Sequence, residues 1–328
     1  MQLRAISVGT RTITNHFDGR VHSVFRRACN LHIDEHTMLT LLSSDMSNTP
    51  GGIRLQTPRK FTFLDYLQAG QTVGNRANIL RVSGSSLSVD LRRAELWYID
   101  LSKLCIKLNK PAPLRAWKIS WTELGSRRNL SGITAMFNDI SVSRLSPSTA
   151  LLAHRARLHI STLLRATVRL RNDQAADVLA KVIGLGPGLT PSGDDFIVGY
   201  LSGLWSTTNN EPARLHFLSS LKANVSSVLN KTNRISRECI QHALEGSVSQ
   251  PIATLAQEIG DGGAWSRLRK AFDNVIQIGH TSGGDAMLGL LLGLIVWQPF
   301  SRCLDWSMSW PPNIDRMLSL QEHRRTHA

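Results

Sequence analysis

Two stretches of the chain repeat one arrangement of hydroxyl, glycine and acidic residues. The first runs from Pro191 to Leu204, and the second runs from Thr281 to Leu294. Each begins with small and acidic residues and passes directly into an apolar run, as a helix does when its first turn faces a ligand. Aligned with each other, the stretches agree at Ser192/Ser282, Gly193/Gly283, Asp195/Asp285, Gly199/Gly289, Leu201/Leu291, Gly203/Gly293 and Leu204/Leu294.

In each stretch a serine precedes an aspartate by three residues, as Ser192 precedes Asp195 and Ser282 precedes Asp285. This spacing predicts a capping box, in which serine and acid each accept a hydrogen bond from a first-turn amide. The glycines between them should leave other amides of that turn uncovered. Uncovered amides at the positive end of a helix dipole predict a site for a small anion. The alternative is a pair of ordinary capped helices whose glycines serve packing.

Glycine-rich loops precede both helix starts, at residues 184–190 and at residues 279–281. Neither loop has the lysine of a Walker A motif or the spacing of a dinucleotide-binding fingerprint. A further polar segment, Thr232 to Arg237, carries arginines that can hold a carboxylate or phosphate. The predicted anion-binding residues are Gly186, Gly188, Thr190, Ser192, Gly193, Asp195, Thr281, Ser282, Gly283, Gly284, Asp285, Arg234 and Ser236.

Two ionisable residues at these loops are the predicted catalytic groups. Asp194 has no capping role, so we predict that it orients a substrate amide or, as the weaker option, binds Mg²⁺. His280 is expected to donate to a developing oxyanion or to protonate a leaving phosphate, with a structural role as the alternative. We assign no metal ligands and no cofactor, and leave Mg²⁺ open.

Glycines recur at a spacing of four inside both apolar runs, as Gly199/Gly203 and Gly289/Gly293. A glycine inside a helix costs about 1 kcal/mol relative to alanine, so these positions need a compensating role. Close approach of two helices supplies one, and we predict that the two helices pack together about a pseudo-twofold axis. Parallel packing would unite their starts in one pocket and antiparallel packing would separate them; the sequence leaves this open.

The predicted fold class is α+β, with a strand-rich N-terminal domain, residues 1–145, before a largely helical domain, residues 146–300. Residues 301–328 are expected to form a loosely attached tail. One early segment, Val21 to Leu31, could be a helix or a strand. Strands are expected within residues 36–43, 78–82 and 86–91, and helices within residues 150–168, 172–184, 212–229, 236–244, 251–259 and 265–278.

Composition narrows the class of protein. The chain has 328 residues, of which 42% are hydrophobic and 19% charged, as in folded globular proteins. We expect no signal peptide, no membrane span and no zinc site, because the apolar runs are short and the four cysteines are scattered. Reduced thiols indicate the cytoplasm. The net charge of +14 comes from dispersed arginines, which favours small anions or acidic protein partners over nucleic acid, with a solvated basic surface as the alternative.

The chain resembles a known bacterial family of largely uncharacterised proteins, one member of which is the AllH subunit of oxamate carbamoyltransferase. Four segments carry the resemblance, which extends to about Phe300: residues 184–195, 279–285, 19–30 and 232–236. It implies a subunit that works beside two partner subunits in purine (allantoin) catabolism. The implied reaction interconverts oxalurate and phosphate with oxamate and carbamoyl phosphate. A non-catalytic anion-binding or scaffolding subunit is the alternative function.

Overall fold

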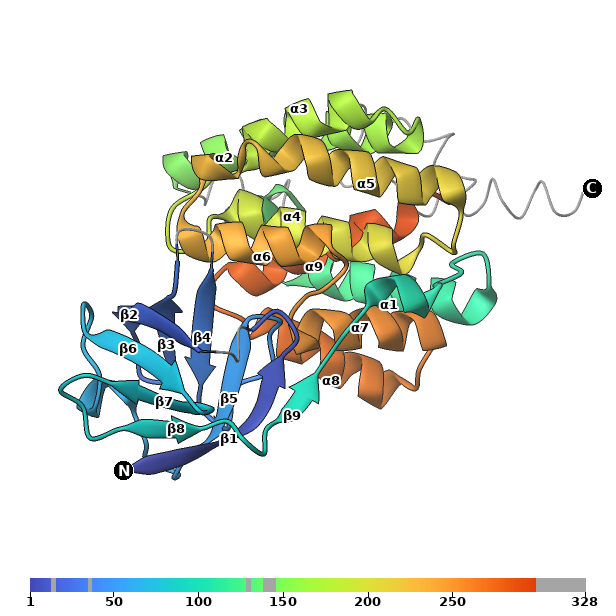
Figure 1. Ribbon diagram of the computed structural model, residues 1–328. Coiled ribbons are helices and arrows are strands. Elements are labelled where there is room, and N and C mark those ends of the chain that lie inside the picture. The colour runs from blue at the N-terminus through green and yellow to red at the C-terminus, as the bar shows by residue number, and fades with distance from the viewer. Residues whose placement is uncertain (13–15, 35–36, 128–130, 138–145, 299–328) are drawn as a thin grey trace, which may run out of the picture. The chain divides into compact units, whose positions relative to one another are not determined.

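The computed structural model describes residues 1–12, 16–34, 37–127, 131–137 and 146–298. These residues form two compact units, drawn in Figure 1. The first unit consists of residues 1–99 together with the short segment 247–250. The second consists of the described residues within 100–246 and 251–298. The secondary structure changes from strands to helices at the same point, because the last strand ends at Trp97.

The first unit is a closed β-barrel. Hydrogen bonding runs in the order β5-β4-β3-β2-β6-β7-β8-β1, and β1 pairs back with β5 to close the barrel. Strand β9 pairs with the second half of β1, beyond the residues that pair with β8. The strands are β1 Gln2–Gly9, β2 Phe17–Val24, β3 Ala28–His32, β4 Met38–Leu42, β5 Gly52–Gln56, β6 Thr72–Arg76, β7 Ile79–Val82, β8 Ser88–Asp90 and β9 Glu95–Trp97.

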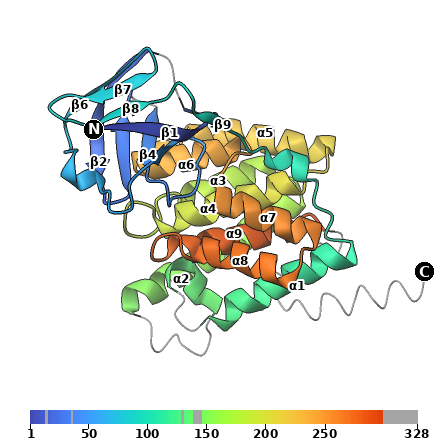
Figure 2. The same cartoon turned by 90° about the horizontal axis from the view of Figure 1, so that it is seen from below.

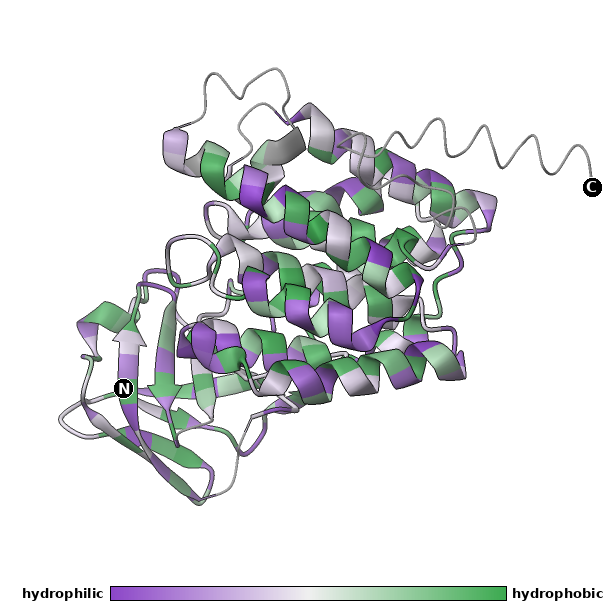
Figure 3. Ribbon diagram, turned by 90° about the horizontal axis from the view of Figure 1, so that it is seen from above, coloured by the Kyte–Doolittle hydropathy of each residue, from purple (hydrophilic) through white to green (hydrophobic). Residues whose placement is uncertain are grey.

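Apolar side chains from successive strands fill the barrel, including Val21, Leu31, Leu41, Leu55 and Val89. Hydrophobic and hydrophilic residues are interspersed along the strands, as expected where one face of each strand is buried (Figure 3). The ambiguous segment from residue 21 to 31 is extended: it contains the end of β2, a turn and the start of β3. The three expected strand segments are also confirmed, as β4, β7 and β8.

The second unit is helical, and most of its helices lie within one or two residues of the expected ranges. The helices are α1 Pro111–Ser126, α2 Pro147–Val168, α3 Asn172–Val182, α4 Ser192–Ser206, α5 Pro212–Ser226, α6 Arg234–Leu244, α7 Gln250–Asp261, α8 Trp265–Ile276 and α9 Ser282–Ile295, with a short 3₁₀ helix, η3, at Gly132–Phe137. None of the helices in the described ranges is long and apolar enough to cross a membrane.

Helix α1 lies in the segment that the sequence analysis assigned to the strand-rich part. Its first turn accommodates Pro111, and it buries Ala116, Trp117 and Trp121 on one face. The strand-rich part therefore ends before residue 100, whereas a division into separate domains at residues 145 and 300 stays a prediction. The expected tail, residues 301–328, lies outside the described residues.

Candidate functional site

The two repeated stretches form helices α4 and α9, which pack closely against each other at the centre of the helical unit (Figures 1 and 2). The interior glycines make this approach possible. A Cβ atom on Gly199 would lie 1.8 Å from the carbonyl oxygen of Ala286, and one on Gly289 would lie 2.1 Å from that of Phe196. The predicted packing of the two glycine-lined helices is confirmed.

The two helices run parallel. Along α4, Gly199 lies against Ala286 and Gly203 lies against Leu290 and Leu294, so residue numbers increase in the same direction in both helices. Both starts therefore lie at one end of the pair, which answers the question that the sequence left open. At that end the hydroxyls of Thr190 and Ser282 are 2.9 Å apart.

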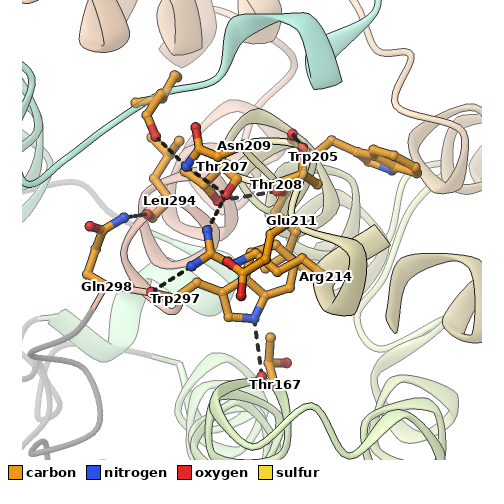
Figure 4. Close-up of polar contacts among 12 residues, drawn as sticks. Thr167, Trp205, Thr207, Thr208, Asn209, Glu211, Arg214, Leu294, Trp297 and Gln298 are labelled. Atoms are coloured by element: carbon orange, nitrogen blue, oxygen red, sulfur yellow. Dashed lines mark hydrogen bonds and ion pairs between the residues drawn. The ribbon is translucent and has the colours of Figure 1, made fainter. Parts of the chain in front are cut away.

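The opposite end of the pair is held by Arg214 of α5 (Figure 4). Its guanidinium donates to the carbonyl oxygen of Thr207 at 2.7 Å, after α4, and to that of Trp297 at 3.4 Å, after α9. It also pairs with Glu211 at 2.9 Å and lies over the Trp297 ring. A cation thus lies where both helix dipoles are negative.

The capping boxes expected from the sequence do not form. The residues before the helices, Pro191 and Thr281, make no side-chain capping bond, and the two serines are the first helical residues. Each serine instead faces the acid of the other helix. The Ser282 hydroxyl stabilises the ionised form of Asp195, and the Ser192 hydroxyl stabilises that of Asp285. The serine and the acid of each stretch therefore link the two helices across the pseudo-twofold axis, and do not cap their own helix.

The amides of Gly193 and Gly283 are not free for a ligand, contrary to the expectation. They donate to the carbonyl oxygens of Leu185 at 2.8 Å and of Ile278 at 2.9 Å. A Cβ on either glycine would lie 2.0 Å from a carbonyl oxygen of the preceding helix, so these glycines serve packing. Among first-turn amides, the described part of the chain offers no backbone acceptor to those of Ser192, Ser282 and Gly284.

Asp285 is fully buried at the junction of α9, α4 and η3. The Thr134 amide donates to its Oδ1 at 3.0 Å, and the Ile133 amide also stabilises the ionised form. Gly132, with φ of +67°, lets η3 approach, because a Cβ there would lie 2.3 Å from Asp285 Oδ2 and 2.7 Å from the Ser192 hydroxyl oxygen. Sequence reasoning missed this contribution of η3; its one local signal is the glycine before Ile133.

Both acids of the pair have raised pKa values. Burial raises the pKa of Asp195 to about 8 despite the Ser282 hydroxyl, and the charges of Asp285 and Asp194 act in the same direction as burial. Burial likewise raises the pKa of Asp285 to about 7, against the hydroxyl and amide groups that favour its ionised form. Within the described part of the chain, Oδ2 of each residue is buried without a hydrogen-bond partner.

Asp194 lies in a different environment from its neighbour. It is buried and accepts the Gly184 amide at 2.7 Å on Oδ1 and the Thr232 hydroxyl on Oδ2, with Ser236 as a third donor. Burial raises its pKa against these hydrogen bonds. The structure therefore makes Asp194 a tie between α4, the glycine-rich loop and the start of α6, and not the unconstrained side chain that the sequence suggested.

The glycine-rich loop is attached to the start of α6. The carbonyl oxygen of Leu189 accepts the Asn233 side-chain amide at 2.9 Å and the Ser236 hydroxyl at 3.4 Å. Gly186 and Gly188 both have φ above +100°, which only glycine adopts readily. Arg234 is half-buried in the first turn of α6, so the structure brings the predicted polar segment to the α4 start.

Two side chains lie on the exposed side of this region. His280 is exposed directly before α9, and its predicted catalytic role stays a prediction, as does ligand contact by the half-buried Thr281.

Cys239 of α6 reaches solvent, yet its thiol lies among many protein atoms. This burial raises its pKa to about 12, with the charges of Asp195, Glu238 and Asp194 adding to the effect. Among the described residues there is no group of three or more histidines, cysteines and acids that could hold a metal ion.

The fold and the site define an α+β protein that joins a closed barrel to a helical unit with paired, parallel helix starts. A family described as oxamate carbamoyltransferase subunit AllH matches residues 182–294, from the end of α3 through nearly all of α9. The AllH family N-terminal domain matches residues 4–96, which span the barrel. Together the matches cover more than half of the chain, and the chain belongs to the AllH family. No solved structure matches it.

Proposed function

We propose that this chain is a subunit of a carbamoyltransferase that interconverts oxamate and carbamoyl phosphate with oxalurate and phosphate. The family description supports the association with this activity. The proposal includes a cytoplasmic setting in purine (allantoin) catabolism, other protein subunits as partners, and no part for membrane or nucleic acid. It further assigns to this chain a small-anion site at the paired starts of α4 and α9.

The observation that carries the anion site is the convergence of both helix starts at one end of a parallel pair. Two helix dipoles then present their positive ends to the same region. The amides of Ser192, Ser282 and Gly284 and the Thr190 hydroxyl are the proposed donors, and Arg234 is the nearby cation. Together they suit a carboxylate or phosphate of the size found in these substrates.

The contacts in the structure lead us to propose different roles for several of the predicted residues. Gly193, Gly283 and Asp194 hold the helix starts in place, since their polar groups are used internally. Gly186 and Gly188 shape the loop, and Ser236 supports it. His280 stays the proposed proton donor on the exposed side, and Thr281 lies beside it.

The proposed chemistry is transfer of a carbamoyl group between two anions. In one direction the amide nitrogen of oxamate bonds to the carbamoyl carbon, the carbon–oxygen bond to phosphate breaks, and phosphate leaves with the bonding electrons. The nitrogen loses one proton, and the leaving phosphate gains one, so the products are oxalurate and hydrogen phosphate. An anion site built from fixed dipoles would hold the phosphate as its charge grows, without reorganisation of solvent.

Calorimetric titration of the purified chain tests the site with carbamoyl phosphate, phosphate, oxamate and oxalurate as separate ligands. We expect saturable binding that Ser192→Ala weakens while circular dichroism shows an intact fold. The amide of residue 192 remains in this variant, but Asp285 loses the hydroxyl donor that links it to the start of α4. The matched control is Ser202→Ala, which removes another buried hydroxyl of α4 that bonds only the helix backbone. Unchanged binding in Ser192→Ala would place the anion elsewhere.

A non-catalytic scaffolding role is the second candidate, favoured by the internal use of the Gly193 and Gly283 amides. It expects Ser192→Ala to leave the activity of the assembled enzyme intact. The same role expects Gly199→Leu to prevent folding, because the added side chain would meet the backbone of α9.

A further inference from the structure

The two acids that face each other across the pseudo-twofold axis receive different kinds of hydrogen-bond donor. Asp285 receives backbone amides of η3, one of them at 3.0 Å from its Oδ1. A buried amide must donate, so it needs an acceptor that stays in place. The amides therefore favour the ionised form of Asp285.

Among the described residues, the groups that stabilise the charge of Asp195 include no backbone amide. Those groups are the hydroxyls of Ser282 and Thr190, which also lie within hydrogen-bond distance of each other. A hydroxyl can donate or accept, so it is satisfied beside a carboxylate and equally beside a carboxylic acid. Both of these hydroxyl contacts are therefore compatible with a proton on the Asp195 carboxyl group.

The neighbouring charges also favour a proton on Asp195. The charges that act on Asp195 are Asp285 of α9 and Asp194 of α4, both negative. On α6, the Cys239 thiol is acted on by the charges of Asp195, Glu238 and Asp194, and the loop 184–190 and η3 carry no titratable side chain. Among neighbouring cations, Arg237 donates to the Leu229 carbonyl oxygen, Lys231 donates to the Ala180 carbonyl oxygen, and Lys181 of α3 acts on His159. Arg234 begins α6, and His280 is exposed before α9.

Two buried carboxylates side by side would be costly, and one proton removes that cost. Burial and the charge of Asp285 both raise the pKa of Asp195, in agreement with the donor pattern. The unpartnered Oδ2 atoms are a second, independent sign. Oδ2 of the fully buried Asp285 and Oδ2 of Asp195 lack partners within the described chain, at a place where both helix starts meet.

We propose that Asp195 is the neutral, proton-carrying member of a carboxyl pair with Asp285, and that it donates a hydrogen bond to an oxygen of the anion held at the helix starts. The ligand class is a small carboxylate or phosphate with an oxygen that can accept this bond. The part of the proposal that concerns the ligand rests on the proposed function. The part that concerns the proton does not.

Oxamate binding measured by calorimetry from about pH 6 to about pH 9 tests the ligand part, because the charge of oxamate is constant there. The wild-type affinity should fall by up to about tenfold per pH unit above about pH 8, as Asp195 loses its proton. In Asp195→Asn a neutral donor replaces the acid, so binding should persist without this pH dependence. Asp195→Ala should bind weakly at every pH.

Glu238→Gln is the matched control, since it removes a nearby carboxylate of α6 outside the proposed site. It should keep the wild-type pH profile. A flat wild-type profile, or the same change of profile in Glu238→Gln and Asp195→Asn, would overturn the donor role of Asp195.

Infrared spectroscopy of the ligand-free chain tests the proton directly. The wild type at neutral pH should show the carbonyl band of a protonated carboxyl group, and the band should be clearly weaker in Asp195→Asn, where only the partly protonated acids such as Asp285 remain. Absence of the band from the wild type overturns the inference whether or not oxamate binds. If the band is present but no oxamate binds at any pH, the proton assignment stands and the anion-donor role and the proposed anion site both fail.

Discussion

At the level of single residues, the site depends on a pairing that crosses between helices. Ser192 and Ser282 stand three residues before Asp195 and Asp285, a spacing that usually closes a bond within one helix. Because α4 and α9 are parallel and lie close together, each serine meets the acid of its neighbour instead. The same four residues thus link the two helix starts and line the region that we propose for the anion.

The buried acids should give the protein a characteristic dependence of stability on pH. An acid whose pKa is raised by folding contributes stability below its unfolded value, near 4, and this contribution is lost as the pH rises through the folded value. We therefore expect the free energy of unfolding to fall between about pH 4 and about pH 8. Urea unfolding of Asp195→Asn should show a smaller fall, and stability at pH 8 above the wild type by about 1 kcal/mol or more.

An equal slope in Asp195→Asn and the wild type would contradict this account. Asp177→Asn, on helix α3 outside the pair, is a control that should follow the wild type.

Gly132 is the residue through which η3 reaches Asp285. Its φ of +67° is strained for other residues, and a Cβ would lie 2.3 Å from Asp285 Oδ2. Gly132→Ala should lower the free energy of unfolding by about 2–4 kcal/mol, from backbone strain and displacement of the carboxylate. Gly188→Ala is the matched control, with a φ of +101° but nothing within 4 Å of the added atom. It should lose about 1 kcal/mol, and equal losses in both variants would argue against a contact-specific role.

At this scale the sequence predicted which residues lie together better than it predicted their contacts. The repeated serines, glycines and acids do gather at one place, since local spacing and the glycine pattern identify them. The roles of Asp194 and of the Gly193 amide could not be predicted, because Thr232 and the Leu185 carbonyl reach them only through tertiary folding. The role of Gly132 was missed because no motif in its own segment indicates a contact with α9.

At the level of elements, the parallel packing of α4 and α9 makes one end of the pair electrostatically positive and the other end negative. Parallel neighbours place like ends of two helix dipoles side by side, which is unfavourable unless opposite charges lie nearby. Asp285, the ionised acid of the proposed pair, lies at the positive ends, and Arg214 lies at the negative ends (Figure 4). Close glycine contact along the interface holds the arrangement together.

The glycine contact makes a sharp prediction for Gly289→Ala. The added Cβ would lie 2.1 Å from the Phe196 carbonyl oxygen, so the helices must separate. We expect a loss of about 3 kcal/mol or more in the free energy of unfolding, measured by chemical denaturation. In the control, Gly260→Ala of α7, the new atom meets only the flexible Ile106 side chain. A loss in Gly289→Ala no larger than in the control would contradict backbone contact between α4 and α9.

Arg214→Met should destabilise the far end of the pair without reaching the anion site. The variant loses two hydrogen bonds to helix-terminal carbonyl oxygens and the ring contact with Trp297, with an expected cost of about 2–3 kcal/mol. Arg267→Met, which breaks an exposed ion pair with Glu258, should change stability by less than about 1 kcal/mol. Thermal unfolding compares the two variants. Equal shifts in the melting temperature would show that Arg214 stabilises the protein no more than an exposed ion pair does.

The positions of the helices along the chain were easier to predict than the way the helices pack together. Helix-start residues and periodicity located α2 to α9 closely, because these signals are local, although the capping boxes expected at α4 and α9 do not form. The parallel direction of α4 and α9 was left open, since it depends on the connection through α5 to α8. Helix α1 was missed, although Pro111 and the Trp117/Trp121 pair are helix-compatible signals, because it follows directly after a strand-rich stretch.

At the level of the whole molecule, the chain combines a closed barrel with a helical unit, and the two family matches fall on these two parts. Alternating burial predicts strands but not their partners, so the sequence indicated a strand-rich region without its closure by β1 and β5. The helical unit contains both copies of the repeat. Since the copies share one end of one helix pair, the account predicts one ligand site per chain.

The stoichiometry of oxamate binding tests this claim most directly, by calorimetric titration of the wild type beside Ser192→Ala and Ser282→Ala. We expect one oxamate per chain and weaker binding in both serine variants, because each variant removes a hydroxyl that links the two helix starts into a single site. Two independent sites, or binding that only one of the variants weakens, would show that the helix starts act separately and would contradict the account.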